Sequence, residues 1–140
     1  MSATEEEKLS LVLRSLGANS LSVHLRARDH LMLRAVQGLP TGLLPHIQEI
    51  PKGKGMAGQA WVQRRAISTC NLQQDSTVPL APRARTVNSQ HAIAIPLEES
   101  GGEVYAVVGF AFPADIEFTD ELLTRCEREA EFLCMTLTER

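Results

Sequence analysis

Three glycines with the spacing G-x-G-x-x-G, at Gly53, Gly55 and Gly58, lie in the middle of the chain and limit what it can fold into. This spacing binds a pyrophosphate when it follows a strand and opens the helix of a parallel βαβ unit. The segment before it, residues 39–50, is interpreted as helix or turn. No second βαβ unit follows Asp75, which lies at the distance of a ribose-binding acid. The glycines therefore predict a sharp turn at Gly53 and Gly55 and close helix packing at Gly58, rather than phosphate binding.

The composition indicates a globular domain and argues against several function classes. With 140 residues, 44% of them hydrophobic, the chain can bury a core without metal or disulfide help. A net charge of -3 and the lack of a basic patch with interleaved aromatics argue against a nucleic-acid partner. Three cysteines without a C-x-x-C pair and four scattered histidines predict no disulfide framework, metal or cofactor. No membrane-length apolar run or signal peptide appears, so we expect a soluble, cytoplasmic protein.

The hydrophobic pattern predicts a single α+β domain over residues 1–140. Its parts are an N-terminal helix in 1–17, a sheet with short helices in 18–113 and a C-terminal helix in 119–140. Apolar residues three and four apart indicate the terminal helices, and apolar–polar alternation indicates strands. In chain order we expect helix 5–16, strands 21–26 and 31–37, helices 43–50 and 56–64, strands 66–70, 90–97 and 103–112, and a helix from 119.

An irregular segment, residues 71–88, interrupts this pattern. It contains Pro79 and Pro82 and shows little periodicity. Long irregular segments inside a small domain are usually functional or mobile, so we expect this one to contribute to a binding site.

Five short segments, in this order and spacing, resemble a GAF domain across nearly the whole chain. They are LMLRAVQGLP at 31–40, GKGMAGQA at 53–60, AIAIPL at 92–97, VVGF at 107–110 and FTDE at 118–121. The resemblance implies a central antiparallel sheet of five to six strands with the terminal helices on one face. Short helices and a pocket loop on the other face would enclose a small-molecule pocket. Such domains sense cyclic nucleotides, haem, bilins, or amino or keto acids, and many dimerise through their terminal helices.

The enzymatic branch of this family, the free methionine-(R)-sulfoxide reductases, needs a reactive thiolate beside the pocket and a resolving thiol. The family's first cysteine lies in the glycine segment, where this sequence has Ala57. Its second would fall near Arg85 or Thr86. Bilin-attachment signatures are missing, and only Asn71 and Asp75 match the dispersed cyclic-nucleotide pattern. We therefore expect a non-enzymatic member of the family.

Several residues are candidates for the implied pocket, each with a simpler alternative. Trp61 would be a pocket wall or a core filler. Arg83, Arg85 and Gln90 would bind a carboxylate or phosphate, or remain solvated. Cys70 would be a redox-sensing thiol or a buried structural one, whereas Cys126 and Cys134 are expected to pack in the core. The predicted ligand-binding set is Trp61, Cys70, Asn71, Asp75, Arg83, Arg85, Gln90 and Phe110.

These observations lead us to expect a regulatory domain that binds a small molecule or a partner and does no chemistry. No kinase, cyclase or DNA-binding segment accompanies it, so its output would pass through protein contact, to a second copy or a separate signalling protein. The predicted interface on the terminal helices comprises Leu9, Val12, Leu16, Leu123, Ala130 and Leu137. Two alternatives stay open: a thiol-based redox enzyme or sensor built on Cys70, and a scaffold whose pocket has closed.

Overall fold

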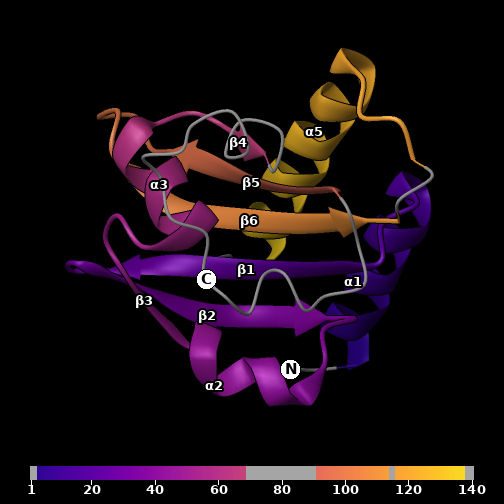
Figure 1. Ribbon diagram of the computed structural model, residues 1–140, viewed down its shortest axis with the longest axis horizontal. Coiled ribbons are helices and arrows are strands. Elements are labelled where there is room, and N and C mark those ends of the chain that lie inside the picture. The colour runs from indigo at the N-terminus through magenta and orange to yellow at the C-terminus, as the bar shows by residue number, and fades with distance from the viewer. Residues whose placement is uncertain (1–2, 69–90, 114–115, 138–140) are drawn as a thin grey trace.

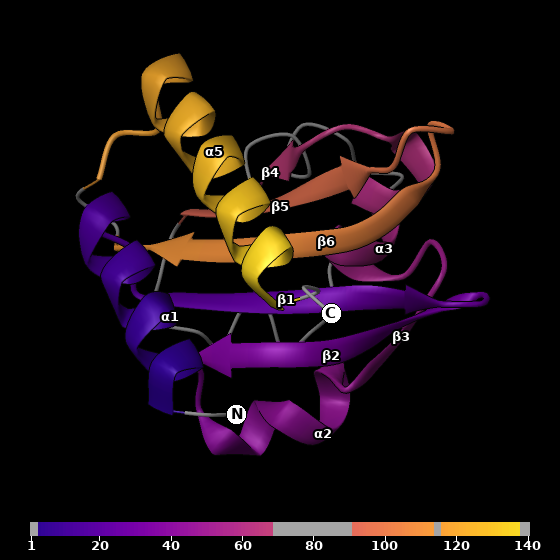
Figure 2. The ribbon, with the colours of Figure 1, turned by 180° about the vertical axis from the view of Figure 1, so that it is seen from behind.

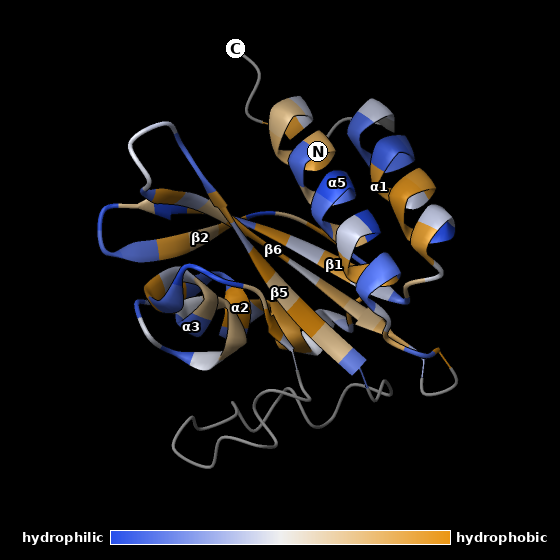
Figure 3. Cartoon of the chain, turned by 90° about the horizontal axis from the view of Figure 1, so that it is seen from above, coloured by the Kyte–Doolittle hydropathy of each residue, from blue (hydrophilic) through white to orange (hydrophobic). Residues whose placement is uncertain are grey.

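A computed structural model of the chain, which describes residues 3–68, 91–113 and 116–137, shows an α+β domain built on one six-stranded sheet. Helices α1 and α5 cover one face of the sheet (Figure 2), and α2 and α3 lie on the other (Figure 1). Figure 3 shows the three layers edge-on. The elements are α1 (Ala3–Leu16), β1 (Ser20–Ala27), β2 (His30–Gln37), η1 (Thr41–Leu43), α2 (Leu44–Ile47), β3 (Glu49–Pro51), α3 (Gly55–Gln63), β4 (Ile67–Ser68), β5 (His91–Glu98), β6 (Val104–Phe112) and α5 (Asp120–Leu137).

The sheet has the strand order β3-β2-β1-β6-β5-β4, and every neighbouring pair is antiparallel. The first and last long strands are therefore joined at the centre, where Leu21 of β1 faces Phe110 of β6. Successive side chains of a strand point to opposite faces, so the two faces of this sheet are built from alternate residues of the same strands. The predicted antiparallel sheet with terminal helices on one face is confirmed.

The larger core lies between the sheet and the terminal helices. Phe112 at the end of β6 is fully buried, and its ring meets that of Phe118 edge-on at a centroid distance of 5.8 Å. The predicted start of the last helix is also confirmed, because Thr119 Oγ1 accepts the N–H of Leu122 at 3.1 Å as an N-cap does. Residues from both helices complete this core: Leu9, Val12, Leu16, Leu122, Cys126, Ala130, Leu133, Cys134 and Leu137. The expected core packing of the two cysteines is thus confirmed.

The segment before the glycines differs from the prediction of a helix over residues 43–50. The helical part covers residues 41–47, and the chain then forms the short strand β3 at the edge of the sheet. Leu33 N–H donates to Gln48 O at 2.8 Å, and His30 faces Pro51 across the β2–β3 pair. Three residues are too few to show a periodicity of their own, so pairing with β2 decides their conformation.

A strand therefore does precede the glycines, and the sequence argument that none does is wrong. The exclusion of a dinucleotide-binding unit holds for a different reason. Strand β3 precedes α3 in the chain and β4 follows it. These two strands lie at opposite edges of the sheet and run in opposite directions. A βαβ unit requires the two strands to be parallel.

Candidate functional site on the face opposite the terminal helices

Trp61 anchors α3 to the sheet. Its side chain is 7% exposed and belongs to a second, smaller core with Leu31, Ile67, Ala94 and Val107. Lys52 Nζ lies 5.2 Å from the centre of its ring, a cation–π distance. The structure therefore places Trp61 as a core filler, with Lys52 of the β3–α3 turn over its ring.

Small side chains occupy the sheet beside this core. Ser22 of β1 pairs with Gly109 of β6, and Ala111 of β6 pairs with Ala92 of β5. These four half-buried residues, here called the small-residue floor, share the face of the sheet that carries α3. A Cβ atom on Gly109 would lie 3.0 Å from Ser22 Oγ, so only glycine fits there without a shift. A glycine within a strand often marks close approach of a ligand or another backbone, and this makes the floor the candidate binding surface.

His24 lies next to the floor and connects the sheet to α2. It faces Leu33 and Val107 across its two strand neighbours and is 2% exposed. Its Nε2 is 2.7 Å from Ile47 O, so the neutral ring with a proton on Nε2 donates to that carbonyl. Desolvation lowers the pKa of His24 below 6.5, and the bond to Ile47 only partly offsets this. His24 is therefore neutral at pH 7.

We expect the stability of the protein to fall as the pH drops below about 6.5. In that window the unfolded chain binds a proton at His24, whereas the folded chain, with its lowered pKa, does not. Stability is therefore lost from pH 6.5 down to the folded-state pKa, and not further below it. Urea unfolding of wild type and His24→Gln between pH 4.5 and 8 measures this, because glutamine can donate to Ile47 O without titrating. Parallel pH profiles for the two proteins would contradict the assignment.

The turn at Gly53 and Gly55 is packed against α3, the helix that follows it. Gly53 and Gly55 have φ values of +84° and +63°, which confirms the predicted sharp turn. Gly58 of α3 packs against the turn, because a Cβ there would lie 2.9 Å from Gly53 C. Gln59 Nε2 donates to Gly53 O at 2.9 Å. The three glycines thus pack a helix onto a turn, as expected.

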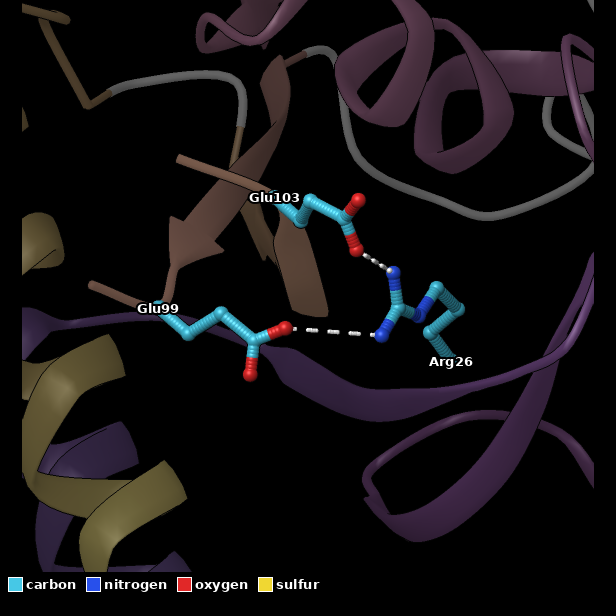
Figure 4. Close-up of polar contacts among 3 residues, drawn as sticks. All are labelled: Arg26, Glu99 and Glu103. Atoms are coloured by element: carbon cyan, nitrogen blue, oxygen red, sulfur yellow. Dashed lines mark hydrogen bonds and ion pairs between the residues drawn. The ribbon is translucent and has the colours of Figure 1, made fainter. Parts of the chain in front are cut away.

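Charged side chains connect the strands at the neighbouring end of the sheet (Figure 4). Arg26 Nη1 donates to Glu103 Oε2 at 2.8 Å, and Arg26 Nη2 lies 3.5 Å from Glu99 Oε1. The hydrogen bond from Arg26 lowers the pKa of Glu103, with smaller contributions from the charges of Arg64 and Lys52. The Glu103 carboxylate is therefore held in its charged form, and the exposed ion pairs connect the ends of the strands.

The described residues contain two cysteines, and both thiols are buried. Burial raises the pKa of Cys126 and of Cys134 to about 12, so both thiols stay protonated at neutral pH. Over residues 3–68, 91–113 and 116–137, no three His, Cys, Asp or Glu side chains are grouped to hold a metal ion. Within the same residues, no helix is long and apolar enough to span a bilayer.

The predicted ligand-binding residues fall into three groups. Cys70, Asn71, Asp75, Arg83, Arg85 and Gln90 lie outside the described residues. Trp61 lies on the α3 face. Phe110 is 2% exposed in the core beneath the terminal helices, on the opposite face, because it shares its side of β6 with Phe112. The structure does not bring Trp61 and Phe110 together. Sequence reasoning missed the floor, although the alternation along β6 places Gly109 opposite to Phe110.

The predicted interface residues are core residues of the same chain. Leu9, Val12, Leu16, Ala130 and Leu137 are at most 8% exposed and pack on the sheet, and Leu123 is half-buried. The five buried side chains are not available to a second protein in the folded chain, whereas Leu123 remains partly accessible. The apolar stripe of an amphipathic helix faces its own sheet in a layered domain, which explains the difference. The exposed apolar residues on these helices are instead Leu11, Phe132 and Met135, with exposed fractions of 57%, 45% and 70%.

Comparison with known proteins agrees with this architecture. A family model described as "GAF domain" matches residues 4–126. No curated protein matches the chain.

Solved structures with the same fold include sensor domains and enzymes. A GAF domain/HD domain protein from Geobacter sulfurreducens has a TM-score of 0.73 at 18% identity, over 96% of this chain and 90% of that one. The GAF domain of a two-component sensor histidine kinase from Bacillus halodurans has a TM-score of 0.68 at 19% identity, over 98% and 94%. A type II free methionine-R-sulfoxide reductase from Thermoplasma acidophilum has a TM-score of 0.67 at 15% identity, over 96% and 95%. Identities this low show a common fold only.

Proposed function

Because this chain belongs to the GAF domain family, we propose that it is a non-catalytic regulatory domain that binds a small molecule or a partner and signals through protein contact. The observation that supports this most directly is that alternate residues of one strand, β6, build both the small-residue floor and the core under the terminal helices. Gly109 and Ala111 of the small-residue floor alternate along β6 with Val108 and Phe110, which pack under the terminal helices. A ligand on the floor would therefore lie one strand thickness from the helices, so a shift of β6 would displace both.

The non-catalytic part of the proposal is supported by the chemistry of the described residues. Both described thiols have raised pKa values, and the ionised groups near the turn end are paired in a structural network. The likeness to sulfoxide reductases is a likeness of fold and carries no activity to this chain. Turnover of free methionine-(R)-sulfoxide by the purified protein with a dithiol reductant, lost in Cys70→Ala, would contradict the proposal and favour the redox alternative.

Ligand binding at the floor is tested with protein purified from its own host. Native mass spectrometry is expected to show an additional bound mass in wild type that is missing in Gly109→Val, because the new side chain would occupy the space beside Ser22 Oγ. Gly101→Val is the matched control, since nothing lies within 4 Å of a Cβ at that position. A mass retained equally by both variants would place the ligand elsewhere. No bound mass, and no thermal stabilisation by any compound of a metabolite set, would favour the closed scaffold.

For the contact surface we propose a second copy of the chain on the outer side of the terminal helices, around Leu11 and Phe132. Burying apolar surface contributes about 25 cal/mol per Å² before the costs of association, so a few hundred Å² supports a modest dimer. Sedimentation equilibrium is expected to show self-association that Phe132→Ser weakens at least tenfold. Val62→Ser is the control, because Val62 is similarly exposed, at 47%, but lies on α3 on the opposite face. Equal behaviour of the two variants would argue for a different partner, such as a separate signalling protein.

A further inference from the structure

A groove of about 790 Å³ runs between α5 and the outer half of β5. Its helix side carries Glu127, Glu131 and Met135, and its strand side ends at Glu98. It lies on the terminal-helix face of the sheet, away from the small-residue floor. It is also on the other side of α5 from α1, whose Ser15 O accepts a hydrogen bond from Arg125. The groove is therefore separate from the small-residue floor. It adjoins the proposed dimer surface, because Phe132 lies four residues after Arg128 and three before Met135 on α5.

The backbone of β5 beside the groove is only partly paired. Strand β4 reaches Ile93 and Ala94, and over the described residues no strand pairs with β5 beyond them on that side. Proline at position 96 has no N–H, which weakens this edge as a template for an added strand. An occupant of the groove would thus be recognised mainly through side chains.

The side chains of the groove have an excess of negative charge. Glu98, Glu127 and Glu131 line it with a single cation, Arg128. Over the part of the chain that the structure describes, none of these four side chains takes part in an ion pair. Glu127 and Glu131 are four residues apart on α5, so they project from successive turns with Cβ atoms about 6 Å apart.

Apolar surface adjoins these charges. Met135, 70% exposed, lies one turn beyond Glu131, and the half-buried Tyr105 contributes to the lining. Methionine is adaptable at binding surfaces, and an aromatic ring attracts cations as well as apolar groups. Carboxylates next to an exposed thioether and a phenol form a surface complementary to a segment that is both basic and apolar.

We propose that this groove docks a helical segment of another protein that presents two Lys or Arg side chains one turn apart beside an apolar side chain. The basic side chains pair with Glu127 and Glu131, and the apolar side chain covers Met135. This goes beyond the function proposed above, since it adds a second contact surface with its own chemistry. A relay of protein contacts would then use adjacent parts of the exposed side of α5, one for a second copy and one for an unlike partner.

The probe for this proposal is a synthetic 14-residue amphipathic peptide with Lys at positions i and i+4 and Leu at i+1 and i+8, labelled for fluorescence anisotropy. Saturable binding is expected at 150 mM salt. Glu127→Gln/Glu131→Gln should weaken it at least tenfold, and Met135→Ser at least threefold. Glu6→Gln/Glu7→Gln is the matched control, because it makes the same change in net charge on exposed residues of α1. It should leave the affinity within twofold.

Two outcomes overturn the proposal. One is no saturable binding, and the other is an equal loss in the groove and α1 variants, which would mean attraction to net charge alone. Phe132→Ser separates this result from the dimer proposal, since it should reduce self-association and leave peptide binding within twofold. Conversely, Glu127→Gln/Glu131→Gln should leave self-association unchanged. Each proposal can therefore fail while the other stands.

Discussion

Replacing Phe112 by alanine is expected to lower the free energy of unfolding by about 3–5 kcal/mol. The ring is fully buried at the end of β6 and packs edge-on against Phe118 with an interplanar angle of 73°. Truncation removes its buried apolar surface, leaves a cavity that the surrounding core can only partly fill, and ends the aromatic contact with Phe118. Urea unfolding followed by circular dichroism measures the change.

Phe132→Ala is the matched control for Phe112→Ala. The same atoms are removed, but from a side chain that is 45% exposed on α5. We expect it to change the free energy of unfolding by less than about 1 kcal/mol, as surface substitutions generally do. Measurements below the dimer concentration keep association out of the comparison. A loss below about 1.5 kcal/mol for Phe112→Ala would show that the core beneath the helices is loosely packed at this end.

Gly38→Ala is the second substitution with a large expected effect, about 2–5 kcal/mol of lost stability. Two causes add. The residue has φ of +87°, which costs an L side chain about 1–2 kcal/mol. In addition, its Cβ would lie 2.3 Å from Asn19 O and 3.0 Å from Ser20 Cα, both backbone atoms at the start of β1. Relieving such an overlap costs about 1–3 kcal/mol, because backbone must move.

Gly102→Ala separates these two causes. Gly102 has nearly the same φ, +84°, but nothing lies within 4 Å of a Cβ there. Its substitution should therefore show the backbone cost alone, about 1–2 kcal/mol. The difference between the two variants, measured by thermal and urea unfolding, gives the contribution of the close approach between Gly38 and Asn19. Equal losses would mean that the end of β2 moves away from β1 freely.

Most helices and strands could be predicted from the sequence because their apolar residues recur with clear helical or strand periodicity. Thr119 before an acidic first turn predicts the start of α5, and the observed bond from Leu122 N–H to Thr119 Oγ1 confirms it. Alternation along residues 21–26 and 31–37 predicts β1 and β2. The strand β3 was missed, since its hydrogen bonds to β2 come from residues distant in sequence. The β-propensity of three residues is too weak to predict a strand without those distant pairing partners.

The candidate site was less predictable than the fold. Phe110 and Gly109 are neighbours in the sequence, and only the register of β6 against β1 shows which of them faces the helices. The alternation along β1 places His24 in a strand but does not show that its side chain is buried and its pKa lowered. The pKa of His24 is lowered because burial in the folded chain desolvates the ring, and the sequence of β1 contains no sign of that burial.

The amino-acid sequence by itself determined the class of fold, the family, and the positions of turns at Gly53 and Gly55, because periodicity and backbone freedom are local properties. Tertiary structure alone decided which apolar residues remain available to partners. Five of the six residues expected at an interface are buried against the protein's own sheet: Leu9, Val12, Leu16, Ala130 and Leu137. Leu11, Phe132 and Met135 are left exposed. Exposure is a property of the packed layers, so a helix cannot reveal from its own sequence which of two apolar surfaces it will bury.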